Sequence, residues 1–181
     1  MKSIDELPRV PAPPIGANKE FVDALVRADA RFLIVGGVAV KFYVPERPVE
    51  DLDLLIEPSK GNASKVLTAV SSSPLFRRDI TVEKLIRPKL QICVKIFEYY
   101  MDILTPGPDL DFIEAWNMAA EARMGNTRVR VAAIATLLQS LSSSQEPKHA
   151  RDRELLEALR GYAADHRMIH RSVGCRGCGP G

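Results

Sequence analysis

The chain has little of what marks membrane, secreted or dedicated nucleic-acid-binding proteins. No stretch approaches about 18 uninterrupted apolar residues, the length at which a membrane span becomes a candidate. The N-terminus lacks a charged stretch followed by an apolar core and a cleavage site, so we expect a cytoplasmic protein. The formal net charge is only +2 at pH 7, which does not indicate a dedicated nucleic-acid binder.

Cysteine is also scarce. Of the three cysteines, Cys175 and Cys178 stand near the end of the chain, preceded by His166 and His170. Together these four residues have the donor types of a two-histidine, two-cysteine zinc site. Their Gly-rich surroundings favour the other interpretation, a flexible basic tail over residues 166–181 with reduced thiols.

What the chain does contain suits one compact domain. Its 181 residues are 46% hydrophobic and 27% charged, which is enough for a single core. Prolines at four of the first 17 positions predict an extended arm over residues 1–17. We expect an α/β catalytic core over residues 18–106 and a helical accessory region over residues 107–165. We find no internal repeat.

Periodicity predicts the order of the elements. Apolar residues at helical spacing follow Asn18, a residue type that caps helices, and alternating residues predict strands around Arg87 and a strand that carries Asp102. A short hairpin is expected around Gly125. The expected helices cover residues 18 to about 30, 60–70, 110–122, 134–141 and 148 to about 162, and the expected strands begin at residue 32 or cover residues 80–86 and 90–97.

Three aspartates are the most informative residues of the chain. Asp51 and Asp53 are one residue apart in an apolar run, and Asp102 lies in a second run. Residues i and i+2 of a strand point to the same face, so Asp51 and Asp53 would stand side by side and repel each other. Close carboxylates of this kind suit Mg²⁺ or Mn²⁺, which also take substrate phosphates as ligands. The pair therefore predicts a metal site, with Asp102 on an adjacent strand.

A glycine pair precedes the aspartates. The apolar run that ends at Val35 leads into Gly36-Gly37 and then into a helical pattern. A strand that turns into a helix through two glycines exposes backbone N–H groups to which a phosphate could bind. Gly-Gly pairs are also common turn formers, and the argument for a phosphate site depends on the aspartates that follow.

Four features together resemble a known family: Gly36-Gly37, Arg47 in a Pro-rich turn, the Asp51-Leu52-Asp53 motif, and Asp102 on a later strand. They resemble the nucleotidyltransferase superfamily that includes DNA polymerase beta, and within it the chain looks closest to small bacterial proteins related to AbiEii-type toxin nucleotidyltransferases. The resemblance covers roughly residues 18 to 160. It implies an α/β fold, a small mixed sheet flanked by helices, with a C-terminal helical part.

The resemblance also implies residue roles. The three acids, Asp51, Asp53 and Asp102, would be catalytic and would hold Mg²⁺ or Mn²⁺. Phosphate binding would fall to Gly36, Gly37 and Arg47. Three places depart from the superfamily pattern. Val38 replaces a Ser or Thr after the glycines, and Val49-Glu50 replaces a Thr or Ser before the Asp pair. Gln139-Ser140-Leu141 replaces a Lys, for which Lys148 or Arg151 are candidate substitutes.

The implied reaction transfers a nucleoside monophosphate from a nucleoside triphosphate to an acceptor hydroxyl, as in toxin-antitoxin enzymes that act on tRNA or protein. A small molecule such as an aminoglycoside is a further possible acceptor. The alternative is a catalytically inactive protein of the same fold that binds a partner or acts as an antitoxin, which Val38 favours and the three retained acids disfavour. A dinucleotide-binding domain is disfavoured because the chain has no Gly-x-Gly-x-x-Gly run.

Overall fold

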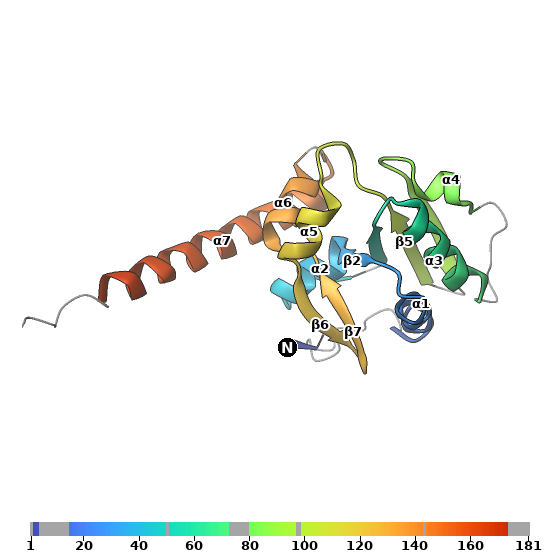
Figure 1. The fold of residues 1–181 in the computed structure, drawn as a ribbon. Helices are drawn as coiled ribbons and strands as arrows, with labels where there is room; N and C mark the ends of the chain where they lie inside the picture. Colours follow the sequence, from blue (N-terminus) through green and yellow to red (C-terminus); the bar gives the residue numbers. More distant parts are fainter. Residues whose placement is uncertain are drawn as a thin grey trace, which may run out of the picture.

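The computed structural model describes residues 2–3, 15–49, 51–72, 80–96, 99–142 and 144–173. These residues form a seven-stranded mixed sheet in the order β1-β6-β7-β2-β3-β5-β4, flanked by helices (Figure 1). The strands are β1 (Lys2–Ser3), β2 (Phe32–Val35), β3 (Leu52–Ile56), β4 (Gln91–Ile96), β5 (Tyr99–Leu104), β6 (Ala120–Met124) and β7 (Thr127–Val131). The helices are α1 (Ile15–Arg27), α2 (Gly36–Tyr43), α3 (Lys60–Ser71), α4 (Val82–Leu85), α5 (Phe112–Met118), α6 (Ile134–Leu141) and α7 (Pro147–Val173).

The centre of the sheet is formed by β2, β3 and β5. Strand β3 is antiparallel to β2 and parallel to β5, so it is hydrogen-bonded along both of its edges. Its residues Leu52, Leu54 and Ile56 are at most 3% exposed. This central position places β3 in the middle of the hydrophobic core.

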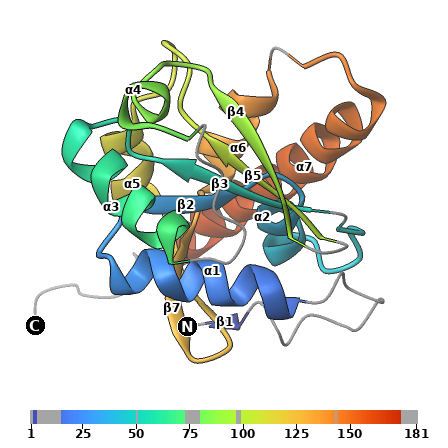
Figure 2. The ribbon, with the colours of Figure 1, turned by 90° about the vertical axis from the view of Figure 1, so that its right-hand side faces the viewer.

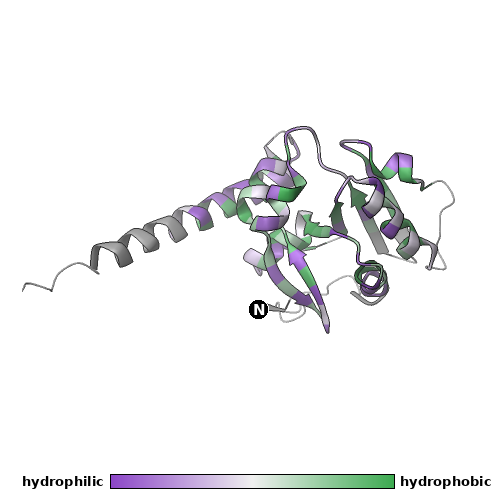
Figure 3. Ribbon diagram, in the orientation of Figure 1, coloured by the Kyte–Doolittle hydropathy of each residue, from purple (hydrophilic) through white to green (hydrophobic). Residues whose placement is uncertain are grey.

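Helices cover both faces of the sheet. Helices α1, α3 and α4 pack together on one face, while α2, α6 and α7 lie on the other (Figures 1 and 2). Hydrophobic residues gather in the central strands, and hydrophilic residues predominate on the outer sides of the helices (Figure 3). The expected mixed α/β fold is therefore confirmed. Among the described helices, none combines the length and apolarity that a membrane span requires.

The hairpin expected around Gly125 is present and extends the sheet. Gly125, at a φ of 57°, lies between β6 and β7, and β7 runs parallel to β2.

The predicted helix over 110–122 is wrong at its end, because α5 stops at Met118 and the chain continues into β6. Ala122 pairs with Val129 and both are buried, so cross-strand packing outweighs the helix propensity of alanine.

The strand predicted over residues 80–86 is also wrong. The chain forms the short helix α4 there, and the Thr81 hydroxyl caps it by accepting a hydrogen bond from the Lys84 N–H at 3.3 Å. Leu85 is fully buried, while Ile80, just before the helix, is 3% exposed. A pattern of apolar residues this short fits a strand and a helical turn equally well, and the threonine cap decides between them.

Helices α3 and α6 lie within one residue of their predicted bounds. Helix α1 begins at Ile15 instead of Asn18, so Asn18 is a helix residue and not a cap, and α1 takes in the end of the arm predicted over residues 1–17. Helix α7 continues beyond residue 162 to Val173, into the segment predicted as a tail. The division of the chain at residue 106 stays a prediction, although β6 and β7 extend the sheet past it.

Candidate active site

The three aspartates meet where β2, β3 and β5 lie side by side. Asp53 on β3 is the register partner of Asp102 on β5, and Asp51 stands just before β3. One carboxylate oxygen from each residue lies within 4.8 Å of the other two. The prediction that Asp51 and Asp53 lie close together, with Asp102 on the strand adjacent to that of Asp53, is thus confirmed, although Asp51 itself lies outside β3. Their role in catalysis and metal binding stays a prediction.

The hydrophobic pattern of β3 fixes this arrangement. Leu52 and Leu54 alternate with Asp53 and are buried on the opposite face of the sheet. A shift of the strand by one residue would expose these leucines and push Asp53 into the core, so the register is strongly specified. The core packing of the strand therefore holds the acid pair in place.

The Asp53 carboxyl is in a strongly perturbed environment. The pKa of the Asp53 carboxyl is raised to about 7, first by burial and then by the negative charges of Asp51 and Asp102. A hydrogen bond from the backbone N–H of Gly37 and the positive charge of Lys148 act in the opposite direction on that pKa. Near neutral pH the Asp53 carboxyl therefore still binds a proton readily, as expected of a buried carboxylate beside other negative charges.

The two carboxylate oxygens of Asp102 differ in their hydrogen bonding. Its Oδ2 accepts a hydrogen bond from the Gln91 side-chain amide at 2.5 Å, whereas its Oδ1 is buried with no hydrogen-bond partner among the described residues. Asp102 as a whole is 7% exposed. A buried carboxylate oxygen without a partner is costly, and a bound cation would satisfy it.

These observations fit a hard divalent cation. Three carboxylates crowd together, one is buried with an unsatisfied oxygen, and another has a raised pKa. All of the donors are oxygens, the type that Mg²⁺ and Mn²⁺ prefer. The donor set of Asp51, Asp53 and Asp102 is therefore chemically suited to such an ion.

The glycine pair forms the expected junction between a strand and a helix, at the start of α2. Gly36 has a φ of 60°, and a β-carbon at this position would lie 2.6 Å from Cγ of Asp53. Glycine is needed here both for its backbone conformation and for the approach of the acid. Gly37 donates its N–H to Asp53. The observed role of the pair is thus to support Asp53, and phosphate binding stays a prediction.

Arg47 lies beside the glycine pair and is bound to α7. Its Nε and Nη2 donate to the two carboxylate oxygens of Asp152 at 2.9 and 3.0 Å. A β-carbon on Gly37 would lie 3.5 Å from Nη1 of Arg47, which places the guanidinium against the start of α2. Its predicted contact with nucleotide remains untested, but the guanidinium lies next to the predicted phosphate site.

Three further residues near the acids had no assigned role or only an open one in the sequence. Gln91 could have been suspected because it alternates with buried residues on a strand next to Asp102. Asp152 gave no local signal, because its partner lies 105 residues away. Of the two suggested substitutes for the missing lysine, Lys148 acts on Asp53 through its charge, while Arg151 is exposed.

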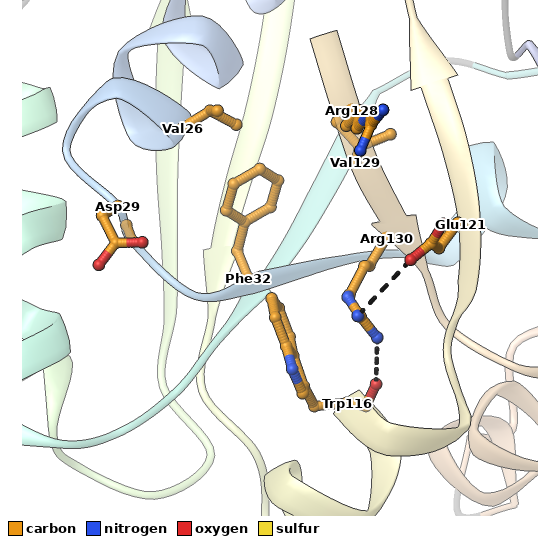
Figure 4. Close-up of a pocket in the computed structure, with 9 residues that line it drawn as sticks. Val26, Asp29, Phe32, Trp116, Glu121, Arg128, Val129 and Arg130 are labelled. Carbon is orange, nitrogen blue, oxygen red and sulfur yellow. Dashed lines mark hydrogen bonds and ion pairs between the residues drawn. The ribbon is translucent and has the colours of Figure 1, made fainter.

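A cavity of about 250 Å³ lies at the other end of β2, away from the acids. It is lined in part by Phe32, Trp116, Glu121 and Arg130 (Figure 4). Arg130 lies 4.6 Å from the centre of the Trp116 ring, donates to the Trp116 carbonyl at 3.0 Å and pairs with Glu121 at 3.8 Å. Because Arg130, Trp116 and Glu121 contact one another, the cavity does not indicate a particular class of ligand.

The possible zinc residues cannot be placed. Cys175 and Cys178 lie outside the described residues, and the side chains of His166 and His170 are outside them as well. The zinc site and the flexible tail both stay predictions.

No family model matches the chain, and no curated protein matches it. The chain is similar in structure to the antibiotic-resistance factor ANT(2″)-Ia. A crystal structure of that protein in complex with adenylyl-2″-tobramycin has a TM-score of 0.53 at 13% identity, with 88% of this chain and 95% of the other covered. Its solution structure has a TM-score of 0.49 at 12% identity, with coverage of 87% and 97%. The likeness to the crystal structure shows a shared fold; closeness to AbiEii-type proteins is not shown.

Proposed function

We propose that the chain is a metal-dependent nucleotidyltransferase, which transfers a nucleoside monophosphate from a nucleoside triphosphate to an acceptor hydroxyl. The observation that carries this proposal is the convergence of Asp51, Asp53 and Asp102, each of which places one carboxylate oxygen within 4.8 Å of the other two. Oδ1 of Asp102 is also buried with no hydrogen-bond partner in the part of the chain that the structure describes. The shared fold supports it, since ANT(2″)-Ia was crystallised with an adenylylated antibiotic.

The chain's residues divide the work of this reaction. Asp51, Asp53 and Asp102 would hold Mg²⁺ or Mn²⁺, which when bound supplies charge stabilisation to the phosphates. Gly36 and Gly37 shape the backbone beside Asp53. The acceptor oxygen forms a bond to the α-phosphorus, the bond to the bridging oxygen breaks, pyrophosphate leaves, and the acceptor proton passes to solvent.

The phosphate tail would lie on the side of Gly37, where positive charge is concentrated. Arg47 contacts this side directly, and the charge of Lys148 reaches Asp53 from α7. Val38 cannot supply the hydroxyl that relatives use after the glycines, and its side chain is 9% exposed. We therefore assign phosphate binding to backbone N–H groups and to these two cations, which stabilise the charge that develops on the leaving pyrophosphate.

Three classes of acceptor are compatible with this reaction. The first two, the 3′ end of a tRNA and a protein hydroxyl, would be acceptors of a toxin-antitoxin enzyme. The third is a small polyhydroxylated molecule. The likeness to ANT(2″)-Ia makes the small-molecule case a necessary arm of any test. The inactive alternative is disfavoured because all three acids come together in one site.

Label transfer tests the proposal. The pure protein is incubated with each of the four nucleoside triphosphates labelled at the α-phosphate, with Mg²⁺ or Mn²⁺, and with total RNA, lysate protein or a panel of aminoglycosides. We expect label in one acceptor fraction together with pyrophosphate release, and neither with the Asp53→Asn variant. A folded wild-type protein that binds nucleotide but never releases pyrophosphate would favour the inactive alternative.

A further inference from the structure

The ion pair between Arg47 and Asp152 joins two distant parts of the chain. Arg47 lies in the loop between α2 and β3, and Asp152 lies in the second turn of α7. Two parallel hydrogen bonds connect them, and the side chains of Arg47 and Asp152 are only 15% and 4% exposed. This two-pronged geometry fixes the orientation of the guanidinium as well as its position.

Such a buried pair needs a reason beyond stability. Removing two charges from water costs about as much as their attraction returns, and apolar residues of similar volume often stabilise a protein equally well. Exposed pairs of this chain, such as Lys148 with Glu146 at 3.5 Å, lack this burial. The pair between Arg47 and Asp152 is therefore better explained by what its geometry positions.

The pair lies next to the candidate active site. The Arg47 guanidinium packs against Gly37, whose N–H donates to Asp53. On α7, Lys148 precedes Asp152 by four residues, so both lie on one helix face. Helix α7 also contacts α2, the helix that begins at the glycine pair. One face of α7 thus carries two charged residues toward the acid cluster.

We propose that Asp152 is a positioning residue that holds the Arg47 guanidinium against Gly37, which makes the start of α7 a wall of the subsite for the nucleotide's phosphate tail. This inference rests on the proposed function and deepens it. The region expected to be an accessory then supplies part of nucleotide binding. The wall favours a triphosphate over a monophosphate, because only the triphosphate extends its charge to Arg47.

Calorimetric titration in Mg²⁺ tests this with a non-hydrolysable nucleoside triphosphate and the matching monophosphate. For Asp152→Asn we expect the dissociation constant of the triphosphate to rise about tenfold, the effect of disturbing one charge-assisted contact, and that of the monophosphate to change less than about twofold. Asp152→Glu should recover part of the affinity. Glu157→Gln is the matched control, because it removes an exposed carboxylate of α7 to which no role is assigned, and it should leave both constants unchanged.

A second variant keeps the test decisive if Asp152→Asn folds poorly. The double variant R47M/D152L replaces both charges with apolar side chains of similar size, which a buried pair tolerates well. Once thermal melts show that it is folded, it should lose the preference for triphosphate. In turnover assays, the apparent KM for the triphosphate should rise about tenfold for Asp152→Asn, with kcat within about threefold.

The outcomes separate the two proposals. If the wild-type protein binds triphosphate and transfers label while Asp152→Asn and the double variant match it in both constants, the inference about Asp152 is overturned and the proposed function stands. If both nucleotides lose affinity equally, the ion pair is merely structural and the inference is likewise overturned. If the folded wild-type protein neither binds triphosphate nor releases pyrophosphate, both proposals fall.

Discussion

The charged side chains near the two ends of β2 differ in how well they are paired. At its end, beside Gly36, three carboxylates crowd together, and Oδ1 of Asp102 is buried without a partner among the described residues. At its beginning, Arg130 is paired with Glu121, bonded to a carbonyl and stacked over Trp116. One end is electrostatically unsatisfied and the other is satisfied. Unsatisfied buried charge indicates a site for a ligand, while satisfied charge indicates packing.

The strongest test of this contrast is Asp53→Asn. We expect transfer to fall by about a thousandfold or more, since a ligand of the catalytic cation is lost and metal effects are worth several kcal/mol. The fold should be as stable as before or slightly more so, because one of several crowded negative charges is removed. Saturating Mg²⁺ should raise the melting temperature of the wild type only. Equal metal-induced shifts in both proteins would show that Asp53 is not a ligand.

The opposite result is expected at the other end of β2. Trp116→Ala should lower the free energy of unfolding by about 2 to 3 kcal/mol, because a large aromatic ring that packs on Phe112 and Arg130 is lost. Transfer measured well below the melting temperature should be unchanged. Trp116→Phe, which keeps a ring, is the matched control for chemical denaturation. If the Trp116→Ala variant folds normally but loses most of its transfer activity, the beginning of β2 has a functional role and the contrast between the two ends is wrong.

The third test is the pH dependence of stability without divalent metal. The folded-state pKa of Asp53 is raised to about 7, above its ordinary value, so the native state binds this proton more tightly than the unfolded state. Stability from this group is present below about pH 4 and is lost as pH rises toward 7. Urea denaturation across this range should show that slope, and Asp53→Asn should remove it. If the stability of the wild type and of the variant changes equally with pH, the raised pKa does not belong to Asp53.

The smallest expected effect is that of Gln91→Leu. The side-chain amide of Gln91 donates a hydrogen bond to Oδ2 of Asp102 at 2.5 Å, so the substitution leaves the Asp102 carboxylate less well oriented. Residues that orient a metal ligand typically change metal affinity by about tenfold, and we expect a Mg²⁺ or Mn²⁺ titration to show a loss of about that size. Asp51 and Asp53 remain, so transfer should persist at saturating metal. An unchanged metal affinity would mean that Gln91 serves only strand β4.

The sequence allowed the position of the acid pair to be predicted because the signal for it is local. The i, i+2 spacing of Asp51 and Asp53 and the buried Leu52 and Leu54 that alternate with them specify strand, face and register together. Helix α6 was equally predictable, because its apolar period continues over its whole length. Neighbouring residues contained the signal for the acid pair and for the helix, whereas Asp102 became a candidate only through its pairing with the two distant aspartates.

What could not be predicted depends on distant partners. Asp152 gains its role from Arg47, and Ala122 becomes a strand residue because it packs against Val129 across the hairpin. At residues 80–86 a short apolar pattern led to the prediction of a strand, but the chain forms a helical turn that Thr81 caps. Local periodicity does not report such contacts, so tertiary packing overrides it.

The double pairing of β3 has a consequence for hydrogen exchange. Amides of a strand bonded on both edges in the core exchange only when the whole domain unfolds, whereas helix ends open locally at lower free energy. The acids therefore persist for the full lifetime of the folded state. Opening of the first turns of α7 would release Lys148 and Asp152 while the acids stay in place. The phosphate subsite proposed for this end of α7 would therefore open more often than the acid cluster.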